Sequence, residues 1–153
     1  MKAVLQRVLS ASVSVDGEVV GKCGQGLFVL LGVIEGDTSL DAQILAKKVC
    51  ELRIFCDEND KMNLSLLNIS GQMLVVSNFT LGADCTHGRR PSFTGAMEPE
   101  GANALYEEFV SLCRAQGVSA ETGVFGADMR ITQTDDGPVT ILLDSRELGR
   151  KKA

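Results

Sequence analysis

Short apolar runs separated by turn residues lie at both ends of the chain and predict strands there. Residues 11–15 and 18–20 are strand-like and enclose Asp16 and Gly17, a pair that favours the two-residue turn of a type I′ hairpin. The other strand-like runs are residues 26–34, 72–79, 129–134 and 139–143. The pattern therefore predicts antiparallel strands at both ends, with the last two runs paired across the turn between them.

Two longer segments carry apolar residues at helical spacing. Thr38 and Asp41 have the spacing of a capping box at the start of the first helix. Pro99 suits the first turn of the second helix, and Gly117 is placed to end it. The apolar faces are Ile44, Leu45, Val49 and Leu52 in the first and Leu105, Phe109, Leu112 and Cys113 in the second. Together with the strands, these two main helices predict a single mixed α/β domain.

The composition fits one folded unit. With 153 residues, of which 44% are hydrophobic and 23% are charged, the chain is long enough for one globular domain with its own core. We expect that domain to cover residues 1–145 and a short basic C-terminal tail to cover residues 146–153. The basic residues of the tail are Arg146, Arg150, Lys151 and Lys152. Such a cluster is usually a group of solvated charges.

The sequence predicts neither export nor membrane insertion. The N-terminal residues lack an unbroken apolar segment, and the longest apolar run, residues 27–34, is far too short for a membrane span. The 5 cysteines are odd in number and widely spaced, which favours free thiols over a disulfide framework. We therefore expect a cytoplasmic protein with no membrane partner.

The sequence restricts the chemistry mostly by what it lacks. His87 is the only histidine, so a serine or cysteine hydrolase would have to use it, and its neighbour Cys85 gives a weak signal. The chain has no metal-ligand spacing and no phosphate-binding glycine loop, so we expect neither a metal nor a cofactor. The net charge of −5 argues against broad neutralisation of nucleic-acid phosphates, although Arg89 and Arg90 form a local basic pair.

Two segments can build a site from backbone groups. Residues 77–81, Ser-Asn-Phe-Thr-Leu, end a predicted strand, where N–H groups left unpaired by the sheet can bind an oxyanion. The alternative is that Ser77 and Thr80 only satisfy a turn through local hydrogen bonds. Gly137-Pro138 is either a hairpin corner or a compact stretch of backbone that projects carbonyls into a pocket. The residues alone leave both questions open.

Five motifs, in order along the chain, resemble the D-aminoacyl-tRNA deacylase family. They are Gln-Arg-Val at residues 6–8, Ser-Asn-Phe-Thr-Leu at 77–81, Gly-Arg-Arg-Pro-Ser-Phe at 88–93, Phe-Gly-Ala-Asp-Met at 125–129 and Asp-Gly-Pro-Val-Thr at 136–140. The resemblance extends from residue 1 to about residue 143, and the joint occurrence of the motifs is highly specific. Two positions depart from the family pattern: Asn78 stands where glutamine is usual, and Asp135 where asparagine is usual.

The resemblance implies a D-aminoacyl-tRNA deacylase-like fold and a cytosolic homodimer whose active sites lie at the subunit interface. Such an enzyme binds the 3′ end of aminoacyl-tRNA and hydrolyses the ester of a D-amino acid, with mischarged glycyl-tRNA as a further expected substrate. The resemblance also implies a cis peptide between Gly137 and Pro138, which each subunit inserts into the active site of the other. This wall of backbone would exclude an L side chain, so L-aminoacyl-tRNA would be rejected.

The resemblance further assigns roles to single residues. The chiral filter is Gly137 and Pro138, and the supporting residues are Arg7, Phe125 and Met129. The expected catalytic residues are Ser77, Asn78, Phe79 and Thr80. Phe79 and Thr80 would offer backbone N–H groups to the substrate. The Thr80 hydroxyl is a candidate nucleophile without a base, so we favour activation by the 2′-hydroxyl of the terminal ribose, with Thr80 secondary.

Two other functions remain open from the sequence. A nucleic-acid-binding protein without enzymatic activity could use the same fold, with the basic C-terminal residues as its contact surface. A general esterase would hydrolyse simple amino-acid esters without any need for RNA. The negative net charge disfavours the first function, and the absence of a catalytic triad disfavours the second.

Overall fold

Strand β1 (Lys2–Val15) lies at the centre of the sheet and pairs with three other strands in the computed structural model, which describes residues 1–149. β2 (Glu18–Cys23) folds back on the second half of β1 through a turn in which Asp16 and Gly17 have φ of 50° and 81°. These positive φ values are those of the hairpin turn that the Asp-Gly pair predicted. β3 (Gly26–Gly32) runs antiparallel to the first half of β1.

The sheet continues beyond β3 with parallel strands. β6 (Gln72–Ser77) is parallel to β3, and β7 (Ser119–Thr122) is parallel to β6. The short strands β4 (Phe55–Cys56) and β5 (Met62–Leu64) form a separate two-stranded sheet. Parallel neighbours need long crossover connections, and each of the two connections here contains a helix.

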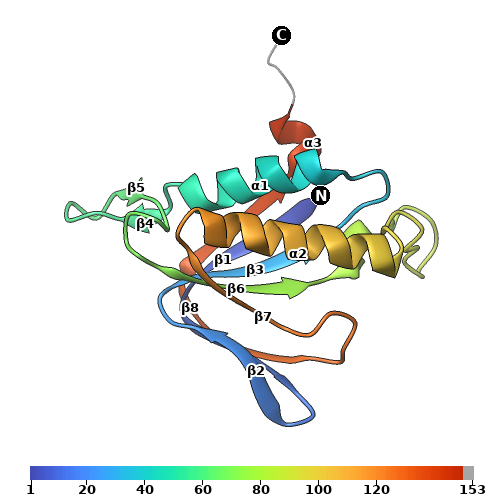
Figure 1. The fold of residues 1–153 in the computed structure, drawn as a ribbon, viewed down its shortest axis with the longest axis horizontal. Coiled ribbons are helices and arrows are strands. Elements are labelled where there is room, and N and C mark those ends of the chain that lie inside the picture. The colour runs from blue at the N-terminus through green and yellow to red at the C-terminus, as the bar shows by residue number, and fades with distance from the viewer. Residues whose placement is uncertain (150–153) are drawn as a thin grey trace.

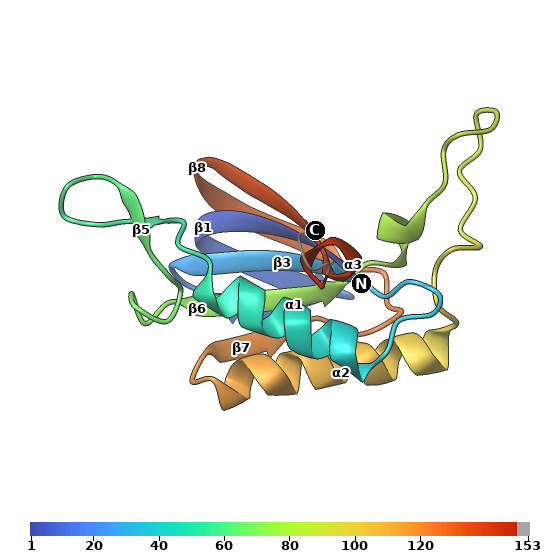
Figure 2. The ribbon, with the colours of Figure 1, turned by 90° about the horizontal axis from the view of Figure 1, so that it is seen from above.

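The two crossover helices cover the same face of the sheet (Figures 1 and 2). α1 (Ser39–Glu51) begins after Thr38, whose predicted capping box with Asp41 is present. α2 (Pro99–Ala115) has its proline in the first turn, as predicted. Gly117 follows the end of this helix with φ of 99°, a conformation that suits glycine. Local sequence signals therefore set the bounds of both helices.

Two clusters of buried side chains hold the layers together. The larger lies between the helices and the sheet and includes Leu5, Leu45 and Phe109, because alternate strand residues point to that face. The smaller lies on the opposite face of the sheet and includes Val8 and Leu74. The central strands are therefore buried on both faces, which explains why β3 and β6 are continuous apolar runs.

The last two predicted strands form one strand, so the predicted pairing between them is wrong. β8 (Arg130–Asp144) runs antiparallel to β1 along nearly its whole length. Pairing stops after Asp135 and resumes at Thr140, so residues 136–139 bulge from one continuous strand opposite Arg7. A Gly-Pro step interrupts a ladder in a bulge just as it does in a hairpin, and the sequence pattern cannot separate the two.

β6 is also shorter than predicted. The strand ends at Ser77, and the chain turns into a short 3-10 helix, η1 (Phe79–Gly82). Asn78 is the cap of this helix, because its side chain accepts the backbone N–H of Thr80. Asparagine favours helix caps and disfavours strands, so the strand ends at Ser77, two residues before Phe79.

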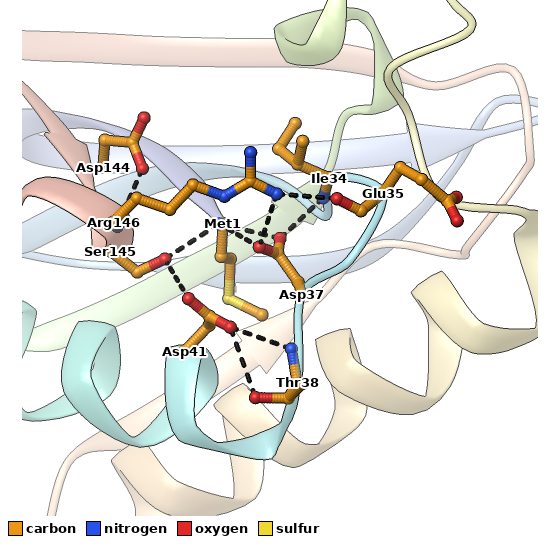
Figure 3. A network of polar contacts seen from close by, with 9 residues as sticks. All are labelled: Met1, Ile34, Glu35, Asp37, Thr38, Asp41, Asp144, Ser145 and Arg146. Carbon is orange, nitrogen blue, oxygen red and sulfur yellow. Dashed lines mark hydrogen bonds and ion pairs between the residues drawn. The ribbon is translucent and has the colours of Figure 1, made fainter. Parts of the chain in front are cut away.

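The first and last described segments of the chain meet at a buried ion pair (Figure 3). The α-ammonium group of Met1 lies 2.7 Å from Asp37 Oδ1 and 2.9 Å from Ser145 Oγ, and both members of the ion pair are 0% exposed. Ser145 begins α3 (Ser145–Leu148) and donates its hydroxyl to Asp41 at 2.8 Å. The start of β1, the segment before α1 and the end of β8 are thereby tied together.

The expected basic tail begins inside this network. Arg146 lies in α3, donates to Glu35 O at 2.6 Å and approaches Asp37 Oδ1 at 3.4 Å. The other basic residues of the tail are Arg150, Lys151 and Lys152, and they lie outside the described residues. The division of the chain at residue 145 therefore stays a prediction.

Replacing Asp37 tests the contribution of the ion pair. Asp37→Asn keeps the size of the side chain and removes the charge opposite the buried ammonium group. We expect the free energy of unfolding, measured by urea denaturation at neutral pH, to fall by about 3–5 kcal/mol, because a buried charge would lose its partner. Asp128→Asn changes an exposed carboxylate and is the matched control, with no measurable effect expected. Equal stability of the two variants would contradict a stabilising pair.

Candidate active site

A pocket of about 750 Å³ lies at the C-terminal ends of the parallel strands β3 and β6. Ser77, the last residue of β6, lines it together with Asn78 and Phe79. Phe125 and Met129, from the segment between β7 and β8, line it as well. The end of β3, the start of β8, the loop before α2 and the first turns of α2 complete the walls. The fold thus brings three of the five sequence motifs to one cavity.

Asn78 determines which backbone N–H groups at the edge of the pocket remain free to bind a substrate. Its own N–H donates to Leu31 O at 2.8 Å, which extends the hydrogen bonding with β3 by one residue. Its side-chain Oδ1 accepts the Thr80 N–H at 3.2 Å and the Thr80 hydroxyl at 2.6 Å. Within residues 1–149 the Phe79 N–H has no acceptor. Of the two N–H groups expected to face a substrate, that of Phe79 is therefore the open one.

The pocket is almost without charge. Among the described residues that line it, Glu98 is the only ionisable one. Its carboxylate caps α2 by accepting the backbone N–H groups of Glu100 at 2.8 Å and Gly101 at 2.7 Å. Because each carboxylate oxygen is engaged in a cap, the described walls supply no uncommitted general base.

Aromatic rings form part of the wall of the pocket. Phe79 and Phe93 meet edge to face, with ring centroids 5.2 Å apart, and are 58% and 41% exposed. Tyr106 contacts Phe125 at 6.1 Å between centroids and donates its hydroxyl to Val75 O at 2.7 Å. Burial raises the pKa of Tyr106 to about 12, so this hydroxyl remains a donor that supports the wall. Large exposed rings beside a cavity indicate a binding surface.

Most of the lining residues, among them Phe93 and Glu98, are not expected at the site from the sequence. Phe93 belongs to one of the five motifs, but no local pattern indicates that its ring reaches Phe79. Glu98 precedes Pro99 at a predicted helix start, and this position is where a capping side chain is expected. The cap was therefore predictable, whereas the aromatic contact was not.

The bulge of β8 exposes a cis peptide at Gly137-Pro138. Arg7, which is 9% exposed, holds the base of the bulge by donating from Nε to Asp136 O at 2.9 Å and from Nη1 to Ile54 O at 2.8 Å. A Cβ atom on Gly137 would lie 2.4 Å from Val139 N, which backbone atoms do not tolerate. The bulge thus needs glycine at this position and has a base fixed by the sheet.

Within one chain the bulge is far from the pocket. Arg7, opposite the bulge, pairs with Leu27 of β3, whereas the pocket residue Ser77 pairs with Leu31 of the same strand. The step from Leu27 to Leu31 spans about 13 Å, and three strand spacings from β8 to β6 add about 14 Å at right angles. The two motifs therefore lie about 20 Å apart in one chain.

The expected site residues consequently form two groups. Those in or beside the pocket are Ser77, Asn78, Phe79, Thr80, Phe125 and Met129. Those at the bulge are Arg7, Gly137 and Pro138. The rival pair, Cys85 and His87, is exposed in the loop before α2. In residues 1–149 there is no group of three side chains that could hold a metal ion and no helix long and apolar enough to cross a membrane.

Solved structures share the whole fold. The structure of a protein named c-Myc DNA Unwinding Element Binding Protein matches with a TM-score of 0.89 and 38% identity, over 94% of this chain and 98% of that chain. The structure of a probable eukaryotic D-amino acid tRNA deacylase matches with a TM-score of 0.80 over 93% of this chain and 97% of that chain. Its identity is 18%, so this second likeness shows the fold alone.

Sequence relatives cover almost the whole chain. A protein of Pelobacter propionicus named D-aminoacyl-tRNA deacylase is 56% identical over 144 residues, which are 94% of this chain and 99% of the relative. A protein of Dehalococcoides mccartyi with the same name is 57% identical over 147 residues, which are 96% of each chain. The profile of the D-Tyr-tRNA(Tyr) deacylase family matches residues 4–144. Since this match covers nearly the whole chain, with both the pocket and the bulge, the chain belongs to the D-Tyr-tRNA(Tyr) deacylase family.

Proposed function

We propose that the protein hydrolyses the ester bond of D-aminoacyl-tRNA, and that of mischarged glycyl-tRNA, and releases free tRNA and the amino acid in the cytoplasm. Membership of a deacylase family supports this reaction class. The observation that carries the proposal is the open Phe79 N–H at the edge of a pocket whose described walls hold no uncommitted charge. Such a neutral site, built from backbone, suits the hydrolysis of an ester.

The pocket suits the 3′-terminal aminoacyl-adenosine of tRNA. Its volume of about 750 Å³ lies in the range of sites that enclose small molecules. The exposed rings of Phe79 and Phe93 can stack on an unpaired base, as aromatic side chains do when proteins bind single-stranded RNA. Phe125 and Met129 add apolar surface. The chemistry requires neither a metal nor a cofactor.

The reaction needs a water molecule and a donor for the developing oxyanion. Water adds to the ester carbonyl carbon, and the Phe79 N–H stabilises the negative charge that forms on the carbonyl oxygen. The bond from that carbon to the ribose 3′-oxygen then breaks, and the 3′-oxygen takes up the proton that the water releases. One such donor typically lowers the barrier by about 2.7–4 kcal/mol.

The 2′-hydroxyl of the substrate is a better activator than Thr80. The Thr80 hydroxyl donates to Asn78 Oδ1, and an amide oxygen is too weak a base to accept its proton. The 2′-hydroxyl is adjacent to the ester and can pass the proton from the attacking water to the 3′-oxygen. Thr80 and Ser77 then have secondary, positioning roles at the edge of the pocket.

Chiral selection is assigned to Gly137-Pro138 of a second copy of the chain. Because bulge and pocket lie about 20 Å apart in one chain, they can act together only across a homodimer. β8 supports such an interface, since it is an edge strand whose apolar residue Leu142 is 75% exposed. A backbone wall beside the α-carbon leaves room for hydrogen or a D side chain and clashes with an L side chain.

Parallel deacylation assays test the function. With one tRNA carrying a D-amino acid, its L-enantiomer or glycine, we expect hydrolysis of the D and glycyl esters and at least about 100-fold slower hydrolysis of the L ester. A simple D-amino-acid methyl ester is the control without RNA and should react far more slowly. Fast turnover of the methyl ester would indicate a general esterase. Salt-dependent binding of nucleic acid without hydrolysis would indicate a binding protein, the role that the name of the 38% identical protein describes.

Thr80→Ala tests whether the Thr80 hydroxyl or the 2′-hydroxyl of the terminal ribose drives hydrolysis. We expect single-turnover hydrolysis to slow by less than about tenfold in this variant, and by about 100-fold or more when the wild-type protein acts on a tRNA ending in 2′-deoxyadenosine. Thr38→Ala is the control, because Thr38 also donates its hydroxyl to a side-chain oxygen, that of Asp41, and does not line the pocket. Near-complete loss of turnover in Thr80→Ala, with unchanged substrate binding, would make Thr80 the nucleophile.

Mixed dimers test whether the filter acts across subunits. Phe79→Pro removes the open N–H and should abolish turnover, whereas Phe79→Leu keeps it and is the control. Gly137→Ala forces the bulge to shift and should admit L substrates. Chains with Phe79→Pro and Gly137→Ala are co-expressed with different tags, and the mixed dimer is purified.

In a cross-subunit site of this mixed dimer, the one active pocket meets an intact bulge. The mixed dimer should then prefer D over L esters as strongly as the wild-type protein does. Discrimination as poor as that of the Gly137→Ala homodimer would place pocket and filter in the same subunit. A wild-type protein that stays monomeric in light scattering would contradict the homodimer itself.

A further inference from the structure

The segment between η1 and α2 forms a loop that projects beyond the sheet and helices (Figure 2). The loop narrows at Asp84 and Ser92, whose backbone groups exchange two hydrogen bonds of 2.7 and 2.9 Å. Residues 85–91 beyond this point form an exposed tip. Phe93 follows at the base, where its ring contacts Phe79 in the wall of the pocket. The tip is therefore mounted on a base that is fixed beside the pocket.

The tip carries two adjacent arginines without an acidic partner. Arg89 and Arg90 are exposed, and within the part of the chain that the structure describes neither forms an ion pair. Asp84, the acid nearest to them in sequence, accepts the Thr86 hydroxyl at 2.6 Å and the Thr86 N–H at 2.9 Å. These bonds, that of the hydroxyl above all, lower the pKa of Asp84 and hold its carboxylate to the loop. Both guanidinium groups remain available to an anion.

We propose that Arg89 and Arg90 bind phosphate groups of the unpaired 3′ end of a tRNA whose terminal nucleoside occupies the pocket, a proposal that rests on the proposed function. A guanidinium group binds phosphate through two parallel N–H···O bonds, a geometry that lysine does not offer. Arg90 lies three residues from Phe93, and this stretch of backbone spans at most about 11 Å. The arginine side chains therefore reach the phosphates next to the nucleoside in the pocket.

The charge distribution favours this partner over a small ester. The pocket has one ionisable residue among its described walls, and that residue is committed to a helix cap, so the pocket cannot attract a polyanion. The chain as a whole has a net charge of −5, which repels phosphates elsewhere on the surface. The loop tip is an exposed basic segment beside the pocket, where phosphates of an RNA can bind and an uncharged ester gains nothing.

The test compares two double variants that each remove two exposed positive charges. Arg89→Ala/Arg90→Ala changes the loop tip, and Lys47→Ala/Lys48→Ala changes α1 as the matched control. Binding of uncharged tRNA with a fluorescent 5′ label is measured by anisotropy over a range of salt concentrations. We expect the loop variant to bind about tenfold more weakly and to lose about 1.4 from the slope of log K against log salt, at roughly 0.7 per phosphate. The control should keep the wild-type slope.

A second measurement uses the adenosine ester of a D-amino acid, which has no phosphate. The loop variant should hydrolyse this ester at the wild-type rate, whereas its KM for D-aminoacyl-tRNA should rise about tenfold with kcat unchanged. The proposal would be overturned if the loop variant kept the wild-type slope of log K against log salt. It would also be overturned if the Lys47→Ala/Lys48→Ala control bound tRNA just as weakly, or if the loop variant hydrolysed the adenosine ester as poorly as it does D-aminoacyl-tRNA. The binding measurement does not depend on hydrolysis. A wild-type protein that hydrolyses no D ester would therefore refute the proposed function, while the slope would still decide the role of the arginines.

Discussion

The pairing of β8 with β1 is the interaction on which the rest of the structure depends. It brings α3 beside Met1 and so closes the buried ion pair with Asp37. The same ladder, interrupted opposite Arg7, produces the bulge that contains Gly137-Pro138. Because pairing resumes on both sides, the two ends of the bulge are fixed, and the Arg7 guanidinium fixes its base from the opposite strand. A free hairpin tip would not present the same backbone in one position.

Local signals predicted the parts of the fold that a few neighbouring residues determine. The Asp16-Gly17 turn, the Thr38 capping box and the proline at the start of α2 each set a φ angle or a hydrogen bond within four residues. β8 was predicted as two strands because a Gly-Pro step has the same local signature in a hairpin and in a bulge. Only the partner strand β1 distinguishes a bulge from a hairpin. Its contact from Arg7 to Asp136 joins residues 129 positions apart, so no local pattern in the sequence reveals it.

The site was less predictable than the fold, for a related physical reason. Residue types alone disfavoured a catalytic triad and retained residues 77–81 as a possible backbone site, but they left its chemistry undecided. The family resemblance, and not the local chemistry, singled out Gly137-Pro138. That Asn78 occupies the Thr80 N–H while the Phe79 N–H stays open depends on where β6 ends. Such contacts depend on three-dimensional position and leave no periodic trace in the sequence.

Under the proposed function, the neutrality of the pocket and the charge of the loop belong to one arrangement. Interactions that bind substrate and transition state equally lower KM without raising kcat, so strong charges next to the ester would add affinity without rate. A backbone N–H acts instead where charge develops during the reaction. Cations carried outside the pocket, at Arg89 and Arg90, supply affinity for RNA through groups that do not touch the α-carbon. Binding of the tRNA is thereby separated from chiral selection at the α-carbon, which can then depend on shape alone.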